Sequence, residues 1–144
     1  MTSGAKVFVG LVIAFHVLAF VAEAILWMSP AVHGIAVARL NPGLQIDVLQ
    51  QAAVLRALFI NQGFYNLLLA LGGLGGLVLL GRGHREAGVA LVRYACVFAV
   101  GAGLVLLATT SAYAGAFLQA GLGAIALLLT FRGAPAHRVT DAKR

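Results

Sequence analysis

Four long apolar runs dominate the chain, and short polar segments separate them. The runs cover residues 7–28, 52–80, 89–108 and 112–131. Each has about the 20 residues that a helix needs to cross a hydrocarbon core of about 30 Å. None shows the ten-residue alternation that is typical of a transmembrane β-strand. The pattern predicts an all-α membrane protein, a four-transmembrane-helix antiparallel bundle that forms a single domain over residues 1–132, with a polar cytoplasmic tail at 133–144.

The connections between these runs differ greatly in length. Residues 29–51 form the longest, which contains Pro30 and an Asn-Pro-Gly turn at 41–43. The second helix is expected to begin soon after Pro42, with Asp47 in its first turn, where negative charge is favoured. Residues 109–111 form the shortest connection. The third and fourth helices are therefore predicted to form a tight antiparallel hairpin.

Small residues recur at four-residue spacing in three of the predicted helices. They are Gly72 and Gly76; Ala95, Ala99 and Gly103; and Ala116, Ala120 and Ala124. Such stripes let helix backbones approach closely in a membrane, where lipid supplies no hydrophobic drive for association. We expect them to pack the bundle internally, and a dimer through one of these faces is the alternative.

The composition excludes several other classes of protein. The chain is 62% hydrophobic and 10% charged, with a mean hydropathy of +1.01, whereas a soluble domain carries about 25% charged residues. This excludes an ordinary soluble domain and a disordered chain. The single cysteine, Cys96, excludes a disulfide scaffold.

The net charge of +6 reflects topology rather than nucleic-acid binding. Basic residues lie mainly at the ends of the apolar runs and form no continuous stripe. In a four-span arrangement, one side carries Lys6, Arg82, Arg85, Arg93, Arg132, Arg138, Lys143 and Arg144, and the other carries Arg39 and Arg56. The positive-inside rule then places both termini of this multi-pass protein in the cytoplasm, on the inner side of a cytoplasmic (inner) membrane.

A cleavable signal peptide is the rival interpretation of the first run. Lys6, the apolar stretch and the small-residue triplet at 22–24 imitate one. However, His16 inside the apolar region and Glu23 at the cleavage site are unusual for a signal peptide. We therefore retain the first run as a span.

Several polar residues interrupt the spans and form the candidate site. His16 and Glu23 lie seven residues apart, which is two helical turns, so they share one face with Phe20 and Trp27. The candidate ligand-binding residues are His16, Glu23, Trp27, Arg56, Asn61, Gln62, Tyr65, Asn66 and Gln119. His16 and Glu23 are also a candidate proton-handling pair, but no catalytic residue is assignable, and whether the protein is an enzyme stays open.

The helical rise brings these side chains to similar depths. With both termini inside, a rise of 1.5 Å per residue puts Glu23 roughly 7 Å outside the midplane, level with Asn61 and Gln62. His16 and Asn66 are expected to meet near mid-depth, with Gln119 within about one turn of them. The polar groups are thus predicted to share a layer in the outer half of the membrane.

An acid in the middle of a span needs compensation, because it costs about 2.5–3.5 kcal/mol on insertion scales. Arg56 can pair with Glu23 if the second helix is tilted, or can instead reach the outer headgroups. Asn61 and Gln62 offer neutral donors. A neutral carboxyl group is the remaining alternative, because burial disfavours the charged form.

Metal and haem chemistry find little support in the sequence, and no cofactor is predicted. His16 is the one histidine inside a span, so bis-histidine haem ligation within one chain is excluded, and His16 with Glu23 alone lacks ligands for a metal.

Cys96 is predicted as a small packing residue near the cytoplasmic end. Trp27 is predicted as an outer-interface anchor rather than a stacking surface. Solvated positions are expected for His33, His84 and His137.

Two motifs carry a resemblance to a known family. Six residues separate His16 from Glu23, and three separate Glu23 from Trp27. The segment NQGFYN at 61–66 comes later, followed by Leu-Ala at 69–70. Together these resemble the small bacterial membrane proteins grouped as domain of unknown function 1304, over most of residues 7–130. The fourth span departs from the family pattern, because no proline follows its Gln-Ala-Gly segment at 119–121. The resemblance implies a four-helix integral membrane protein and implies no reaction.

Three functions remain open at this stage. In the first, a lipid, quinone or other small amphipathic ligand binds the intramembrane polar site, which handles a proton. In the second, the same residues clamp the helices of a structural or accessory subunit in a larger membrane complex. In the third, a homodimer forms a small transporter, since four helices leave little room for a pathway. Membrane lipids are the expected partners, and nucleic acid is not.

Overall fold

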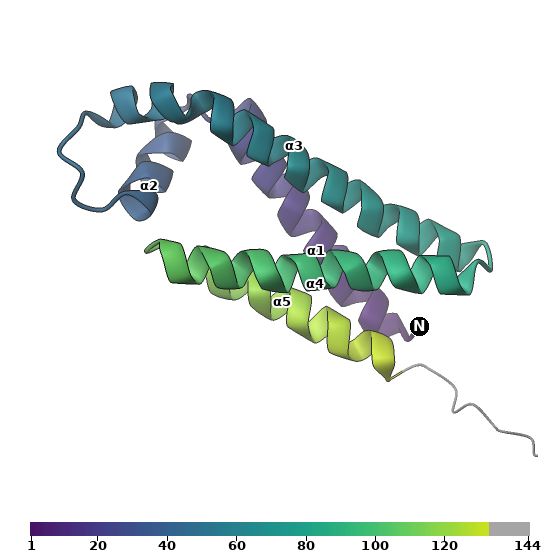
Figure 1. Ribbon diagram of the computed structural model, residues 1–144. Helices are drawn as coiled ribbons and strands as arrows, with labels where there is room; N and C mark the ends of the chain where they lie inside the picture. Colours follow the sequence, from purple (N-terminus) through teal and green to yellow (C-terminus); the bar gives the residue numbers. More distant parts are fainter. Residues whose placement is uncertain (133–144) are drawn as a thin grey trace, which may run out of the picture.

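A computed structural model describes residues 1–132 of the chain, and the predicted tail at 133–144 lies outside these residues. The described part is helical, with no strand. Its elements are α1 (Ser3–Phe20), the π-helical turn η1 (Val21–Ile25), α2 (Pro30–Leu40), α3 (Val48–Gly81), α4 (Arg85–Thr109) and α5 (Tyr113–Phe131). Figure 1 shows their arrangement.

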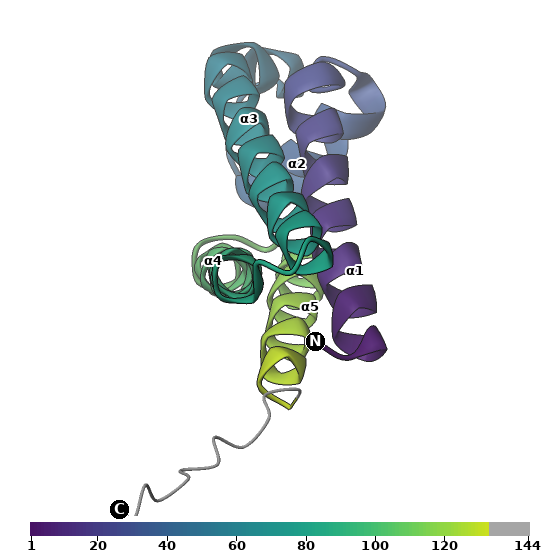
Figure 2. The same cartoon turned by 90° about the vertical axis from the view of Figure 1, so that its right-hand side faces the viewer.

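Four of these helices are long and apolar enough to cross a membrane, which confirms the predicted fold class. They are Ser3–Ile25, which includes the π turn, Val48–Gly81, Arg85–Thr109 and Tyr113–Phe131. The four long helices form a ring in the order α1, α3, α4, α5. Each packs against the next, and α5 closes the ring against α1. Seen after a 90° turn, α1 and α3 lie side by side and α4 is viewed almost along its axis (Figure 2).

The predicted 29–51 connection contains a fifth helix, α2, which the hydropathy pattern did not predict. Ser29 precedes the helix in extended conformation and Pro30 occupies its first turn, an arrangement suited to a helix start. The helix ends before the turn at Asn41, and Asp47 then caps α3 by accepting from the backbone N–H groups of Leu49 and Gln50. The predicted start of the second span near Asp47 is therefore confirmed, while the connection before it is largely helical.

The prediction that His33 is solvated is wrong. His33 lies in α2 with 5% of its surface exposed, and its Nδ1 lies 3.1 Å from the backbone carbonyl of Trp27. The physical reason is the helix itself, which turns one face of α2 inward against α3. Trp27, Val37 and Ala52 form the small apolar core of this contact.

The helices form two closely packed pairs, α1 with α3 and α4 with α5. At the α4–α5 contact, a Cβ on Gly103 would lie 2.6 Å from the backbone nitrogen of Ala120. At the α1–α3 contact, a Cβ on Gly73 would lie 3.1 Å from Ile13. The predicted internal use of small residues thus holds for Gly103 and Ala120. In α3 it holds for Gly76 but not for Gly72, which has open space around it, while the neighbouring Gly73 makes the contact with α1.

The two pairs meet at one end and diverge at the other. Near the 82–84 connection, α3 touches α4 so closely that a Cβ on Gly76 would lie 3.0 Å from the backbone nitrogen of Val92. Cys96 is buried in the core beside this contact, with Val9, Val92 and Ala99. We call this the closed end. The opposite, open end carries α2 and residues 110–112, and here α3 and α4 spread apart in Figure 1.

The α4–α5 contact gives a test of the packing. Replacing Gly103 by alanine is expected to lower the free energy of unfolding by about 1–3 kcal/mol, because overpacking forces the two backbones apart. Gly101→Ala is the matched control, since the same helix leaves open space there. Reversible unfolding in mixed micelles, followed by circular dichroism, measures both. Equal stability of the two variants would contradict the close contact.

Candidate functional site

A large cavity lies between the two helix pairs at the open end. Its volume is about 1320 Å³, and all five α-helices and the π turn contribute to its lining. Along α4 the lining runs from Phe98 to Thr109, a helical rise of about 16 Å. Leu58 and Val105 line it yet remain 61% and 63% exposed, so the cavity is open to the surroundings. It therefore extends from the interior of the spans to their open end.

The π-helical turn η1 holds Glu23 at the wall of this cavity. The turn covers Val21–Ile25, and the backbone N–H of Leu26 donates to the carbonyl of Val21 at 2.9 Å, five residues back. Such turns are rare and occur frequently at functional sites. Opposite it, a Cβ on Gly63 would lie 2.8 Å from the backbone nitrogen of Ala24. Glycine at this position thus lets α3 approach the turn that carries the acid.

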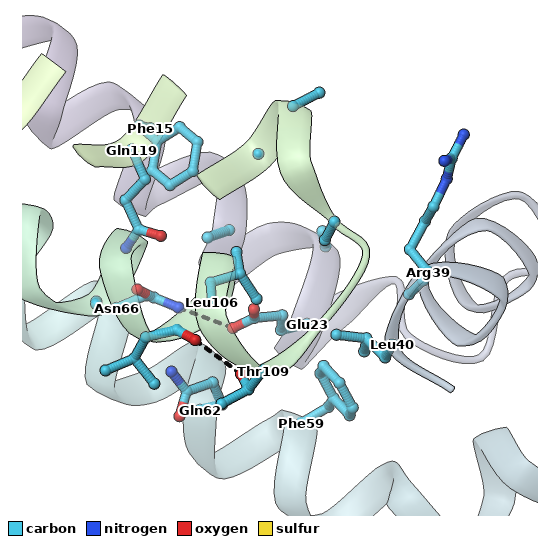
Figure 3. A pocket seen from close by; sticks show the side chains of 18 of the residues that line it. Phe15, Glu23, Arg39, Leu40, Phe59, Gln62, Asn66, Leu106, Thr109 and Gln119 are labelled. Carbon is cyan, nitrogen blue, oxygen red and sulfur yellow. Dashed lines mark hydrogen bonds between the residues drawn. The ribbon is translucent and has the colours of Figure 1, made fainter. Parts of the chain in front are cut away.

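Asn66 of α3 is the hydrogen-bond partner of Glu23. Its Nδ2 donates to Glu23 Oε2 at 2.8 Å, as the dashed line in Figure 3 shows. Gln62, one turn earlier on α3, lines the same cavity and is exposed. The depth estimate had placed Gln62 level with the acid. The partner is therefore Asn66, one turn further along α3 than the depth estimate predicts.

His16 belongs to a second polar contact, behind the cavity wall. Its Nδ1 lies 2.7 Å from the carbonyl of Val12, which can only accept, so Nδ1 carries the proton. In the neutral ring Nε2 then accepts, and the Gln119 amide approaches it to 3.5 Å. His16 is 1% exposed, with the ring of Phe15 at its edge. The structure thus joins His16 to Gln119 and does not bring it into contact with Glu23.

Trp27 lies inside the protein and not at its lipid-facing surface, so the interface-anchor prediction is wrong. The side chain is 2% exposed, and its Nε1 donates to the backbone carbonyl of Ala52 at 2.8 Å. Its ring stacks on Phe59 with centroids 3.7 Å apart and planes 8° apart. α2 covers the side of Trp27 that the four-span prediction leaves in lipid. Trp27 therefore ties the end of the π turn to α3.

Four of the predicted ligand-binding residues lie outside the cavity: His16, which is buried, and Arg56, Asn61 and Tyr65. Arg56, Asn61 and Tyr65 are exposed on α3 and are absent from the lining. Arg56 therefore does not provide the charge partner for Glu23 that a tilted helix would allow. The structure instead brings Glu23, Gln62, Asn66, Trp27 and Gln119 to the cavity wall.

Sequence reasoning missed the contributions of α2 and of the α4–α5 connection. Ile35 and Arg39 of α2 line the cavity with Ser111. Ser111 also ties the two segments, because its backbone N–H and its hydroxyl both donate to the Arg39 carbonyl, at 3.0 and 2.7 Å. The Ser29–Pro30 pair was the available signal for α2, since it combines a capping residue with proline in the first turn.

The arrangement suits binding of an organic ligand better than binding of a metal. Across residues 1–132, no group of three or more His, Cys, Asp or Glu side chains is placed to hold a metal ion. The cavity wall offers instead one carboxyl group, three amides and a largely apolar surface. Ligand sites commonly combine an apolar lining with a few convergent polar groups.

Comparison with known proteins identifies the family. The chain matches a family described as a protein of unknown function, DUF1304, over residues 10–131. It belongs to the DUF1304 family. The match covers both motifs that carry the resemblance, at Glu23 and at 61–66, and thus confirms it. No curated protein and no solved structure matches this DUF1304 chain, so the site alone must support its function.

The environment of Trp27 can be tested directly, because it is the single tryptophan of this DUF1304 protein. We expect a blue-shifted emission that is quenched weakly by aqueous acrylamide and weakly by brominated lipids, since the ring is enclosed by protein. Fluorescence of the chain in lipid nanodiscs measures both. Strong quenching by brominated lipid would instead support an interface anchor.

The Glu23–Asn66 bond can be measured by a double-mutant cycle. For Glu23→Ala and Asn66→Ala we expect a coupling of about 0.6–1.7 kcal/mol in the free energy of unfolding, the range of interhelical hydrogen bonds in membranes. Glu23→Ala with Tyr65→Ala is the control, and should be additive within about 0.5 kcal/mol. Additive losses for the first pair as well would show that the bond contributes nothing.

Proposed function

We propose that the protein binds a small amphipathic molecule in the cavity at its open end, with Glu23 and Asn66 as the polar anchor. The observation that carries this proposal is the cavity of about 1320 Å³ that meets this pair. Its volume exceeds the roughly 300–1,000 Å³ of common ligand sites. The cavity therefore has room for a ligand, and the Glu23–Asn66 pair at its wall can orient that ligand.

The lining favours a ligand that is mostly apolar. Aromatic rings of Phe15, Phe98 and Tyr113 contribute to it, while polar groups gather at the Glu23 wall and near Ser111. A molecule with an apolar body and one polar group fits such a distribution. A lipid, a quinone or another small amphipathic compound has this chemistry.

The charge distribution orients the protein in this proposal. Lys6, Arg82 and Arg85 lie at the closed end, whereas Arg39 lies at the open end. By the positive-inside rule the closed end then faces the cytoplasm, and the cavity lies in the outer half of the membrane. A ligand would reach it from the outer leaflet.

The accessory-subunit alternative makes a different demand on the same residues. A pure clamp needs its polar groups paired with one another and no space beside them. His16 meets that description, since it is buried, contacts Gln119 and does not line the cavity, although Gln119 itself reaches the cavity wall. Glu23 does not meet it, because it lies at the wall of a large open space. The ligand-binding proposal therefore rests on Glu23 rather than on a His16–Glu23 pair.

Filling the cavity tests the proposal. Ala102 of α4 lines it, and Ala102→Phe places a ring inside; Ala108 of the same helix is exposed and outside the lining, so Ala108→Phe is the matched control. We expect mass spectrometry of the gently purified protein to find a bound small molecule, reduced about tenfold or more by Ala102→Phe, a change of about 1.4 kcal/mol. Equal occupancy in both variants, or no bound molecule in the wild-type protein, would favour the accessory role.

A further inference from the structure

Glu23 keeps one oxygen available to the cavity. Oε2 accepts from Asn66, and Oε1 has no hydrogen-bond partner within the described residues. Every fully buried side-chain oxygen or nitrogen among residues 1–132 has a hydrogen-bond partner. Because Oε1 has none, it is not fully buried and retains accessible surface. Because Glu23 lines the cavity and is half-buried, that surface belongs to the cavity wall. A ligand can therefore reach the carboxyl group.

The described residues place no cation against this acid. Arg39 is the one lysine or arginine of the described lining, and its side chain extends away from Glu23 in Figure 3. Arg56 is exposed and outside the lining. The Asn66 amide is neutral. A carboxylate at this position thus has a hydrogen bond but no counter-ion from residues 1–132.

The rest of the lining suits a bulky cation with an apolar body. A carboxylate only accepts hydrogen bonds, and its charge-assisted bonds are roughly twice as strong as neutral ones. The rings of Phe15, Phe98 and Tyr113 add surfaces that attract cations through their π faces. Apolar surface elsewhere in the lining accommodates the remainder of such a molecule.

We infer that the cavity takes lipophilic organic cations, with the Glu23 carboxylate as their counter-ion. This inference rests on the proposed function, because it needs the cavity to be a binding site, and it adds the chemical class of the ligand. A neutral hydrogen-bond acceptor such as a quinone carbonyl is the competing class. It would bind a protonated Glu23 and would not need the negative charge.

Two probes of similar shape distinguish these classes. Tetraphenylphosphonium is a lipophilic cation, and triphenylphosphine oxide is its neutral analogue with an acceptor oxygen. Equilibrium dialysis of the full chain in neutral detergent, against protein-free micelles, measures the affinity for each. We expect the wild-type protein to bind the cation at least about tenfold more tightly than the neutral analogue.

Variants then assign the difference to the carboxylate. Glu23→Gln keeps an acceptor for Asn66 but removes the charge, and is expected to weaken binding of the cation at least about tenfold while changing that of the neutral probe less than about twofold. Gln62→Lys is a second variant, which leaves Glu23 in place and adds a competing cation to the same wall (Figure 3). It should weaken cation binding in the same way, and circular dichroism verifies the fold of both.

The outcomes separate failure of this inference from failure of the proposed function. Cation binding that neither Glu23→Gln nor Gln62→Lys weakens, or tighter binding of the neutral probe, would overturn the cation assignment. If Ala102→Phe still abolished binding while Ala108→Phe did not, the cavity would remain a ligand site. If Ala102→Phe changed the binding of neither probe, both the cation assignment and binding within the cavity would be overturned.

Discussion

Close approach of helix backbones at small residues is the constraint on which the rest of this structure depends. Gly63 and Gly73 hold α3 against η1 and α1, and Gly103 and Gly123 hold α4 against α5. Between the two pairs, the comparable contact of Gly76 with α4 lies near the short 82–84 connection. Without similarly close contacts at the other end, the pairs diverge there. The cavity is therefore a result of where small residues occur along each helix.

The polar groups divide between this cavity and the packed interior. His16 and Gln119 meet beside aromatic rings, where His16 has almost no exposed surface. Glu23 and Asn66 meet at the wall of the open space. A bond of the first kind holds helices together, whereas the second kind also leaves acceptor capacity for another molecule. Exposure to the cavity thus separates Glu23 from His16, whereas Asn66 and Gln119 are both buried and both line the cavity.

Much of the fold follows from the sequence because hydropathy reports directly on burial in lipid. The four spans and the start of α3 at Asp47 required only run length and capping chemistry. The contact between the first and second spans also followed from depth, although the estimate put the acid level with Asn61 and Gln62 rather than Asn66. The π turn at Val21–Ile25 departs from the straight α-helix on which that estimate rests, but its small change in rise does not account for a full turn of about 5.4 Å. Nothing in the local residue pattern distinguishes such a turn from an ordinary helical one.

The surroundings of Trp27 show why the remainder was inaccessible to sequence reasoning. An indole at the end of an apolar run usually lies at the lipid surface, but here α2 folds back and encloses it. Whether a short helix lies over its neighbour depends on contacts between distant segments, such as Trp27 with Ala52. The cavity is likewise a property of helix crossing, which periodicity does not encode.

The link between Ser111 and the Arg39 carbonyl has a mechanical consequence. It joins α2, which is anchored on the first helix pair, to the turn that connects the second pair. Widening the gap at the open end would thus break two hydrogen bonds at once. Leu58 and Val105, by contrast, are exposed apolar side chains that line the cavity from α3 and α4 and take part in no such bond. Entry of the ligand proposed above past these two side chains would leave both of these hydrogen bonds in place.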